Sequence, residues 1–162
     1  MKKVEPPQST PSAPPRRLVL YVEDNDDNWS VAELRLASVY RLIRASTDRQ
    51  ACALLTKHAA ELYIVLMDIE LQGSRLDGVA LTRLLRGRLP ADQTPDYARS
   101  VAPSNVPVVF VTAYHAAFGS RLQETGANLV IPKPVEFRHL IRELTSMHLE
   151  AIAGAPRNPT SR

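Results

Sequence analysis

The sequence predicts one α/β domain in which five parallel strands alternate with five helices, and three observations support it. The chain has 162 residues, which is enough for one ordinary domain with a proper core and too few for two. Short apolar runs alternate with helical patterns along most of this length. Five such alternations are typical of parallel βαβ units in an open sheet that helices cover on both faces.

The first half of the chain contains three apolar runs with the length of strands. Residues 18–22 and 62–67 are nearly continuous apolar segments, and the second is the strongest strand signal in the chain. Residues 40–45 form a weaker strand. Helical patterns over about residues 26–39 and 48–60 follow the runs at 18–22 and 40–45, so a β-α-β-α-β order is predicted.

The second half continues with helix, strand, helix, strand and helix. These elements are predicted over about residues 77–85, 106–111, 116–124, 129–131 and 136–153. Pro107 lies near the start of the strand at 106–111, where the missing backbone N–H of a proline is tolerated. Gly126 marks the end of the helix at 116–124. Because crossovers between parallel strands are right-handed, a doubly wound, flavodoxin-like sheet with the strand order 2-1-3-4-5 is expected.

The two ends of the chain differ in composition from the rest. Residues 1–17 hold five prolines and four basic side chains with almost no apolar bulk, and residues 154–162 are similar, so both tails are predicted to be disordered. The domain itself is expected over residues 18–153, which carry 14 basic and 16 acidic side chains, a net charge of −2. The basicity of the chain therefore belongs to its tails, and direct binding of nucleic acid is not expected.

The sequence also bears on the compartment. No apolar run approaches the roughly 20 residues of a membrane-spanning helix, and residues 1–17 lack the apolar stretch of a secretory signal. A single cysteine, Cys52, cannot form an internal disulfide and suits a reducing environment. A cytoplasmic protein without membrane insertion is expected.

Chemically informative side chains follow four of the predicted strands. Glu23 and Asp24 follow the first strand, Asp68 the third, Thr112 the fourth and Lys133 the fifth. In open parallel sheets, ligands bind at the carboxyl ends of the strands. Three carboxylates there would repel one another, and Mg2+ with oxygen ligands would relieve the repulsion. A lysine and a hydroxyl could bind a phosphoryl group and a carboxylate could attack it, so the set indicates an aspartyl phosphate.

The segments LVLYVEDN, YIVLMDIE, VPVVFVTAY and GANLVIPKPVEF, in this order, resemble the receiver domain of response regulators over about residues 18–152. The resemblance implies that Asp68 accepts the phosphoryl group and that Asp24 binds Mg2+ with help from Glu23. It also implies that Thr112 and Lys133 contact the phosphoryl oxygens. The third protein ligand of the metal would be the backbone carbonyl of Glu70, and the Lys133–Pro134 bond would be cis.

The chain departs from the family pattern in three places. The Met-Pro pair that usually follows the phosphoacceptor is absent, with Gln72 in place of the proline and about two extra residues before Asp77. The connection over residues 88–105 is about ten residues longer than usual, polar and rich in proline. It joins its neighbours at the amino end of the sheet, so it is expected to leave the chemistry untouched. Val130 replaces the usual aromatic residue three positions before Lys133, which puts the conventional switch in doubt.

The resemblance implies a single-domain response regulator of two-component signalling, expected as a monomer or weak dimer. Its expected partners are a sensor histidine kinase or phosphotransfer protein and a downstream protein target. It would be no enzyme beyond catalysing its own phosphorylation and dephosphorylation. A phosphorelay intermediate remains an alternative.

Three other functions are open on the residues alone. A haloacid-dehalogenase-type phosphatase also uses a nucleophilic aspartate with Mg2+, but it needs a second aspartate where this chain has Glu70. A flavin-binding module on the same topology would meet repulsion from Asp24, Asp26 and Asp27. A degenerate receiver used as a scaffold is disfavoured because all of the site positions are filled.

Overall fold

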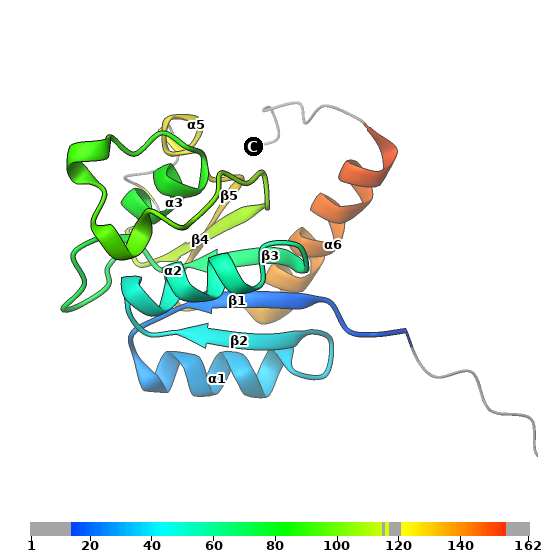
Figure 1. Cartoon of the computed structure of the whole chain (residues 1–162). Helices are drawn as coiled ribbons and strands as arrows, with labels where there is room; N and C mark the ends of the chain where they lie inside the picture. The colour runs from blue at the N-terminus through cyan, green and yellow to red at the C-terminus, as the bar shows by residue number, and fades with distance from the viewer. Residues whose placement is uncertain (1–13, 115, 117–120, 155–162) are drawn as a thin grey trace, which may run out of the picture.

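The computed structural model describes residues 14–114, 116 and 121–154, and its centre is one five-stranded sheet (Figure 1). All pairings between neighbouring strands are parallel, and the strand order is β2-β1-β3-β4-β5. The strands are β1 (Leu18–Val22), β2 (Arg41–Ala45), β3 (Leu62–Met67), β4 (Val108–Thr112) and β5 (Leu129–Pro132). The predicted sheet and strand order are confirmed.

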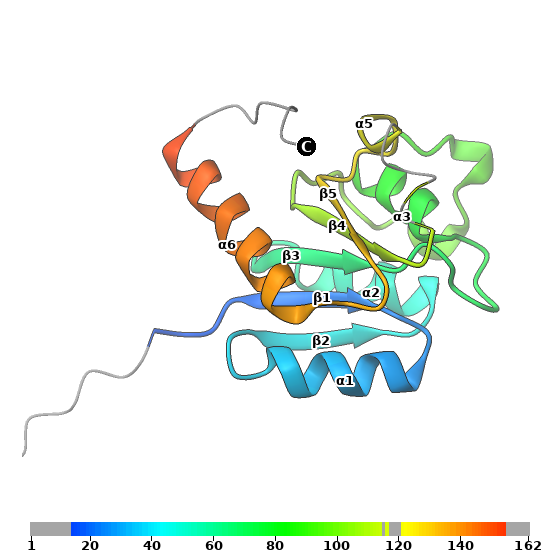
Figure 2. The same ribbon diagram turned by 180° about the vertical axis from the view of Figure 1, so that it is seen from behind.

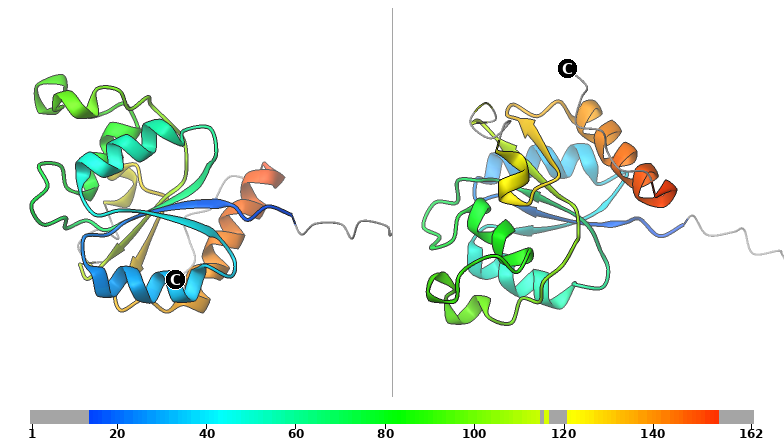
Figure 3. Two further views of the ribbon diagram at one scale, coloured as in Figure 1. Left: turned by 60° about the horizontal axis from the view of Figure 1, so that its bottom comes forward. Right: turned by 90° about the horizontal axis from the view of Figure 1, so that it is seen from above.

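Helices cover both faces of this sheet. They are α1 (Asp26–Leu36), α2 (Asp48–Lys57), α3 (Gly78–Leu85), α5 (Leu122–Thr125) and α6 (Phe137–Ala153). Figure 3 (left) shows α1 and α6 below the sheet and α2 with α3 above it, and α5 lies beside α3. This doubly wound arrangement is the predicted one, although part of the helix predicted at 116–124 lies outside the described residues.

Two apolar layers hold the helices on the sheet. Successive residues of a strand point to opposite faces, so Leu20 and Val22 of β1 join the core under α2 and α3, whereas Val19 and Tyr21 join the core under α1 and α6. All five residues of β1 are buried, as expected of a central strand in a parallel sheet. The site at its carboxyl end is therefore attached to a rigid support.

The boundaries differ from prediction in ways that hydrogen bonding explains. Strand β4 begins at Val108 rather than residue 106, because Pro107 has no N–H and only its carbonyl joins β3, accepting from Val65 N at 2.9 Å. Helix α1 ends at Leu36, whose carbonyl accepts from Val39 and Tyr40 in a closing turn. The predicted disordered tails, 1–17 and 154–162, lie mostly outside the described residues.

The segment 88–105, called the insertion below, is more ordered than its composition indicated. It contains two 3-10 helices, η1 (Ala91–Gln93) and η2 (Asp96–Ala98). Its end is at the amino edge of the sheet, where Ser104 N donates to Leu85 O at 2.7 Å. Its middle packs on α2, with Ala98 and Val101 buried in the core.

The insertion ends at the amino edge as predicted, but it also reaches the opposite edge of the sheet. The hydroxyl of Tyr97 donates to the carboxylate of Asp48, the first residue of α2. Since α2 begins just after the carboxyl end of β2, this contact lies at the edge that carries the predicted site. The insertion therefore packs along α2 and is not confined to the amino edge of the sheet, where its ends lie. Within the described ranges, no helix is both long and apolar enough to cross a membrane.

Candidate functional site

Adjacent strands deliver the predicted site residues to one edge of the sheet (Figure 2). Glu23 and Asp24 follow β1, Asp68 follows β3, Thr112 ends β4 and Lys133 follows β5. The ladders continue to these positions, since Asp68 N donates to Val22 O and Lys133 N donates to Thr112 O, both at 2.9 Å. The sheet thus sets the relative positions of these residues before any side chain interacts.

Glu23 is a fully buried carboxylate with a partner for each oxygen. Its Oε1 accepts from Asn25 N at 3.1 Å, and its Oε2 accepts from the Tyr21 hydroxyl at 3.2 Å and from Lys133 Nζ at 2.8 Å. Burial and the neighbouring Glu23 raise the pKa of Tyr21 well above its usual value, so this hydroxyl remains a donor. The Glu23 carboxylate is therefore held in place facing Lys133.

Lys133 links the buried Glu23 carboxylate to Asp68, the predicted phosphoacceptor. Its Nζ lies 2.7 Å from Asp68 Oδ2 as well as 2.8 Å from Glu23 Oε2. Burial lowers the pKa of Lys133, but the two carboxylates outweigh it and leave the net pKa above the usual value. Burial together with repulsion by Glu23 raises the pKa of Asp68, although the Lys133 ammonium opposes this. The Lys133 ammonium thus pairs with both carboxylates.

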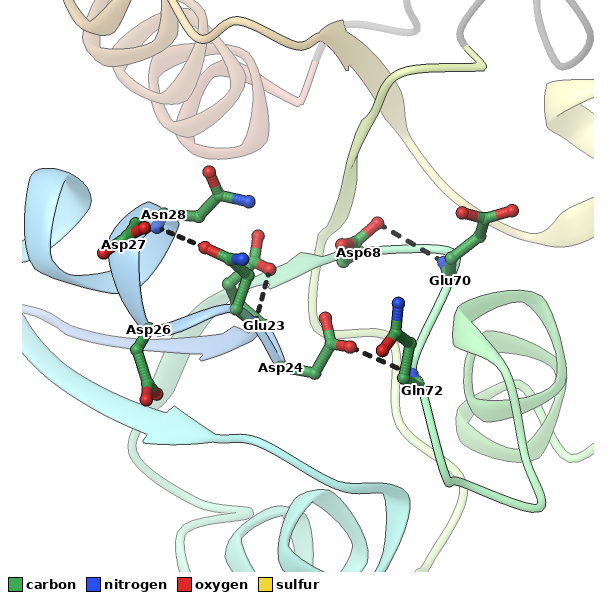
Figure 4. Close-up of a pocket in the computed structure, with 9 residues that line it drawn as sticks. Glu23, Asp24, Asp26, Asp27, Asn28, Asp68, Glu70 and Gln72 are labelled. Atoms are coloured by element: carbon green, nitrogen blue, oxygen red, sulfur yellow. Dashed lines mark hydrogen bonds between the residues drawn. The ribbon is translucent and has the colours of Figure 1, made fainter.

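Asp24 is fixed through its backbone and its side chain. Arg44 donates from Nε to the Glu23 carbonyl and from Nη2 to the Asp24 carbonyl, both at 3.0 Å. One side-chain oxygen of Asp24 accepts from Gln72 N at 3.0 Å (Figure 4). The loop that follows Asp68 is therefore tied to the carboxylate of Asp24.

The charge and donor set of this cleft suit a divalent cation. Carboxylate oxygens of Glu23, Asp24 and Asp68 lie within 4.8 Å of one another. With only the Lys133 ammonium among them, these three groups leave two negative charges in excess. Hard cations with oxygen ligands such as Mg2+ match this set. Glu23 has no exposed surface, whereas Asp24 is partly exposed and Asp68 is 6% exposed, so Asp24 and Asp68 are the better direct ligands.

Two further predicted residues lie at the margin of this cluster. The Thr112 side chain is buried, and its Oγ1 accepts from Tyr114 N at 3.1 Å, which orients the hydroxyl. Glu70 N donates to Asp68 Oδ1 at 3.3 Å, and Figure 4 shows the Glu70 side chain directed away from Asp24. Glu70 thus contacts Asp68 through its backbone N–H, while the role of its carbonyl as a metal ligand stays a prediction, and the Lys133–Pro134 bond is cis.

Sequence reasoning missed one close contact beside Asp68, the predicted phosphoacceptor. Gly78, the first residue of α3, donates from its N to Ile69 O at 2.9 Å, and a Cβ at this position would lie 2.1 Å from Asp68 O. The pair Asp77-Gly78 was predicted only as the start of a helix. The sequence signal was the glycine itself at the first position of the helix, where a side chain is normally tolerated.

Comparison with known proteins gives a structural result rather than a sequence result. No family model and no curated protein matches this chain. The receiver domain of NtrX from Brucella abortus is 25% identical with a TM-score of 0.62, and the match covers 79% of this chain and 95% of that one. The receiver domain of the sensor histidine kinase PA1611 from Pseudomonas aeruginosa, solved with magnesium in its active-site cleft, is 27% identical with a TM-score of 0.62, covering 81% and 96%.

A more distant neighbour has the same fold. The receiver domain of response regulator 1452 from Francisella is 16% identical with a TM-score of 0.64, over 83% of this chain and 98% of that one. The chain thus has the receiver-domain fold of response regulators, as the sequence predicted. This fold supports a role in two-component signalling.

Proposed function

We propose that this chain is a phosphoacceptor of two-component signalling, in which Asp68 takes a phosphoryl group in a reaction that depends on Mg2+. The observation that carries the proposal is the position of Lys133 Nζ, 2.7 Å from Asp68 Oδ2 in a cleft where three carboxylates converge. The structural neighbour from Pseudomonas aeruginosa contains magnesium in its active-site cleft, which supports the choice of metal.

The transfer would form one bond and break one. The donor is a phosphohistidine of a sensor kinase or phosphotransfer protein. A carboxylate oxygen of Asp68 forms the bond to phosphorus while the phosphorus–nitrogen bond breaks, and the electron pair of the broken bond stays on the ring nitrogen. The imidazole leaves as a neutral ring when its other nitrogen carries a proton, and otherwise it takes up one proton. Lys133, which pairs with Asp68 before the reaction, would then pair with a phosphoryl oxygen, and the Thr112 hydroxyl would donate to another.

The metal would be held by Asp24, Asp68 and the backbone carbonyl of Glu70. When bound it supplies positive charge that offsets the repulsion between the carboxylates and the incoming phosphoryl group. Glu23 would act through Lys133, because it is fully buried and its Oε2 accepts from Lys133 Nζ. The phosphorylated surface would then change the affinity for a downstream protein. The haloacid-dehalogenase alternative lacks its second aspartate, since Glu70 stands at that position.

Acetyl phosphate tests the proposal without knowledge of the kinase. Incubation of the chain with acetyl phosphate and Mg2+ should add one phosphoryl group by intact mass, and hydroxylamine should remove it. Asp68→Asn keeps the shape of the side chain but removes the nucleophile, so it should gain no such group. Labelling of this variant at the wild-type rate would show that Asp68 is not the acceptor.

A direct metal titration belongs to the same experiment. Asp24→Ala should weaken Mg2+ binding by about tenfold or more and leave the fold intact, because removing one of three repelling carboxylates relieves repulsion in the metal-free protein. Calorimetry measures the affinity, and the fluorescence of Trp29, five residues after Asp24, gives a second readout. Equal affinities in the two proteins would contradict the proposed metal site.

A further inference from the structure

Asp48 joins three segments that are far apart in the sequence. It is only 3% exposed, and its Oδ2 accepts from Arg75 N at 3.1 Å, from Leu76 N at 3.0 Å and from the Tyr97 hydroxyl. A buried carboxylate is stable when hydrogen bonds replace its hydration. These hydrogen bonds outweigh burial and hold the pKa of Asp48 below its usual value. Asp48 is thus an anion with a fixed position.

The segment between β3 and α3, residues 68–77, is anchored on Asp48 at its far end. Besides the bonds from Arg75 and Leu76, the Ser74 hydroxyl oxygen accepts from Asp48 N at 3.1 Å. Three consecutive residues of this phosphoacceptor loop therefore contact Asp48. The bonds from Arg75 and Leu76 come from backbone N–H groups, so they constrain the path of the loop itself.

The near end of the phosphoacceptor loop is anchored on the candidate metal site. Gln72 N donates to Asp24 Oδ2 at 3.0 Å, and Glu70 N donates to Asp68 Oδ1 at 3.3 Å. The loop thus runs between two fixed carboxylates, Asp24 at one end and Asp48 at the other. Glu70, whose carbonyl is the proposed third metal ligand, lies two residues before Gln72 and so directly adjoins this span, and a change at Asp48 first reaches Gln72 and the Asp24 carboxylate that holds it. A shift at Asp48 would be passed to that carbonyl through six residues of backbone.

The insertion holds Asp48 from the other side. The Arg49 guanidinium lies 4.2 Å from the centre of the Tyr97 ring, a cation–π contact that fixes the ring over the start of α2. The next residue, Ala98, is fully buried and anchors η2 in the core. The contacts of the Tyr97 ring and of Ala98 therefore fix the position from which the Tyr97 hydroxyl donates to Asp48.

We propose that Asp48 and Tyr97 are positioning residues through which the insertion sets the place of the phosphoacceptor loop, and with it the affinity of the site for Mg2+. Neither side chain is proposed to touch the metal or the phosphoryl group. The inference rests on the proposed function, because it concerns the same metal site. It assigns to the insertion a role in the chemistry of this site in place of the neutral role expected from the sequence.

The test is Mg2+ affinity in the full chain, measured by calorimetry for the wild type, three single variants and one double variant. Tyr97→Phe removes one hydroxyl and keeps the ring over Arg49, and Asp48→Asn keeps the shape but not the charge. Each should weaken Mg2+ binding about three- to tenfold, a smaller loss than direct partners of metal ligands give. Tyr63→Phe is the matched control, since its hydroxyl bonds Leu144 O at 3.2 Å on the other face of the sheet. Its affinity should equal that of the wild type.

Two further readouts separate positioning from general damage. At saturating Mg2+ the rate of labelling by acetyl phosphate should return to the wild-type value in Tyr97→Phe, because Asp68 and Lys133 are unchanged. The amide resonances of Gln72 and Leu76 should move in metal-free Tyr97→Phe and not in Tyr63→Phe. In the double variant the loss should be less than the product of the two single losses, because both act through one contact.

The possible failures are distinguishable. A wild-type chain that binds no Mg2+ would overturn the proposed metal site and this inference together. A wild-type chain that binds Mg2+ while Tyr97→Phe and Asp48→Asn bind it equally well would overturn this inference alone. An affinity loss in Tyr63→Phe as large as in Tyr97→Phe would also overturn it, since the effect would then be a general loss of packing.

Discussion

Gly78 lets the first turn of α3 approach the backbone of Asp68, and at the scale of single residues this is the tightest steric constraint on the site. A methyl group there would lie 2.1 Å from Asp68 O and 2.9 Å from Ile69 Cα. Backbone atoms cannot rotate aside as a side chain can. Residue 78 therefore has to be glycine if the Asp68 peptide is to keep its place.

Gly78→Ala should lower the free energy of unfolding by about 1–3 kcal/mol and slow labelling of Asp68, because relief of the contact requires a backbone shift. Denaturant unfolding and intact mass measure the two effects. Gly73→Ala is the contrast: nothing lies within 4 Å of its Cβ position, so only the left-handed backbone (φ 72°) opposes it, at about 1 kcal/mol. A stable, normally labelled Gly78→Ala protein would show that the contact is not limiting.

At the scale of elements, Arg86 joins the end of α3 to two other segments at the amino edge of the sheet, 104–106 and 126–128. Its guanidinium donates to the carbonyls of Ser104, Val106 and Gly126 at 2.7, 2.9 and 2.9 Å, and to Asn128 Oδ1 at 3.2 Å. A planar group with five donors suits such a divergent set of acceptors, and an ammonium group does not. This one side chain closes the insertion and orients the entry to β5.

Arg86→Lys should therefore destabilise the fold by about 1–3 kcal/mol, as expected when part-buried carbonyls lose their donors. The midpoint of urea unfolding measures this. The exposed Arg88→Lys, two residues further, serves as the matched control and should change stability by less than about 0.5 kcal/mol. If the two variants unfold at the same urea concentration, the hydrogen bonds of Arg86 contribute nothing net.

The elements differ in how far the sequence predicts them. Strands could be located because each is an apolar run, and the strand-end rule for parallel sheets then brought Glu23, Asp24, Asp68, Thr112 and Lys133 together. The insertion carries no such pattern, because Ala98 and Val101 are isolated apolar residues among polar ones and prolines. The bond from Tyr97 to Asp48 spans 49 residues, and local reasoning cannot find a partner at that distance.

At the scale of the whole molecule, one buried thiol reports on the integrity of the core. Cys52 is 1% exposed in the layer between α2 and the sheet. Burial, followed by the nearby Asp48 carboxylate, raises its pKa to about 11. Both effects keep the sulfur protonated and inaccessible near neutral pH, although thiolate is the reactive form.

Cys52 in the folded chain should therefore react with an aromatic disulfide reagent at pH 8 only as fast as the protein opens. Absorbance of the released thiolate measures the rate, and the same chain in guanidinium should react at once. Since the folded pKa lies above the unfolded one, this group contributes stability below about pH 9 that is lost as the pH rises toward 11. Immediate reaction of the native chain would show that α2 does not cover the thiol.

The junction at Asp48 has a consequence for the order in which the chain folds. Its contacts span 27, 28 and 49 residues, so each closes a long loop of backbone and gains nothing until its distant partner has arrived. A chain that has left the ribosome only as far as η1 can pair β1, β2 and β3, yet it lacks the tyrosine that completes the junction. The framework of the sheet can therefore form early in synthesis, whereas the loop beside Asp68 waits for the middle of the insertion. The candidate metal site, though built on β1 and β3, is therefore among the last parts of the molecule to reach its final geometry.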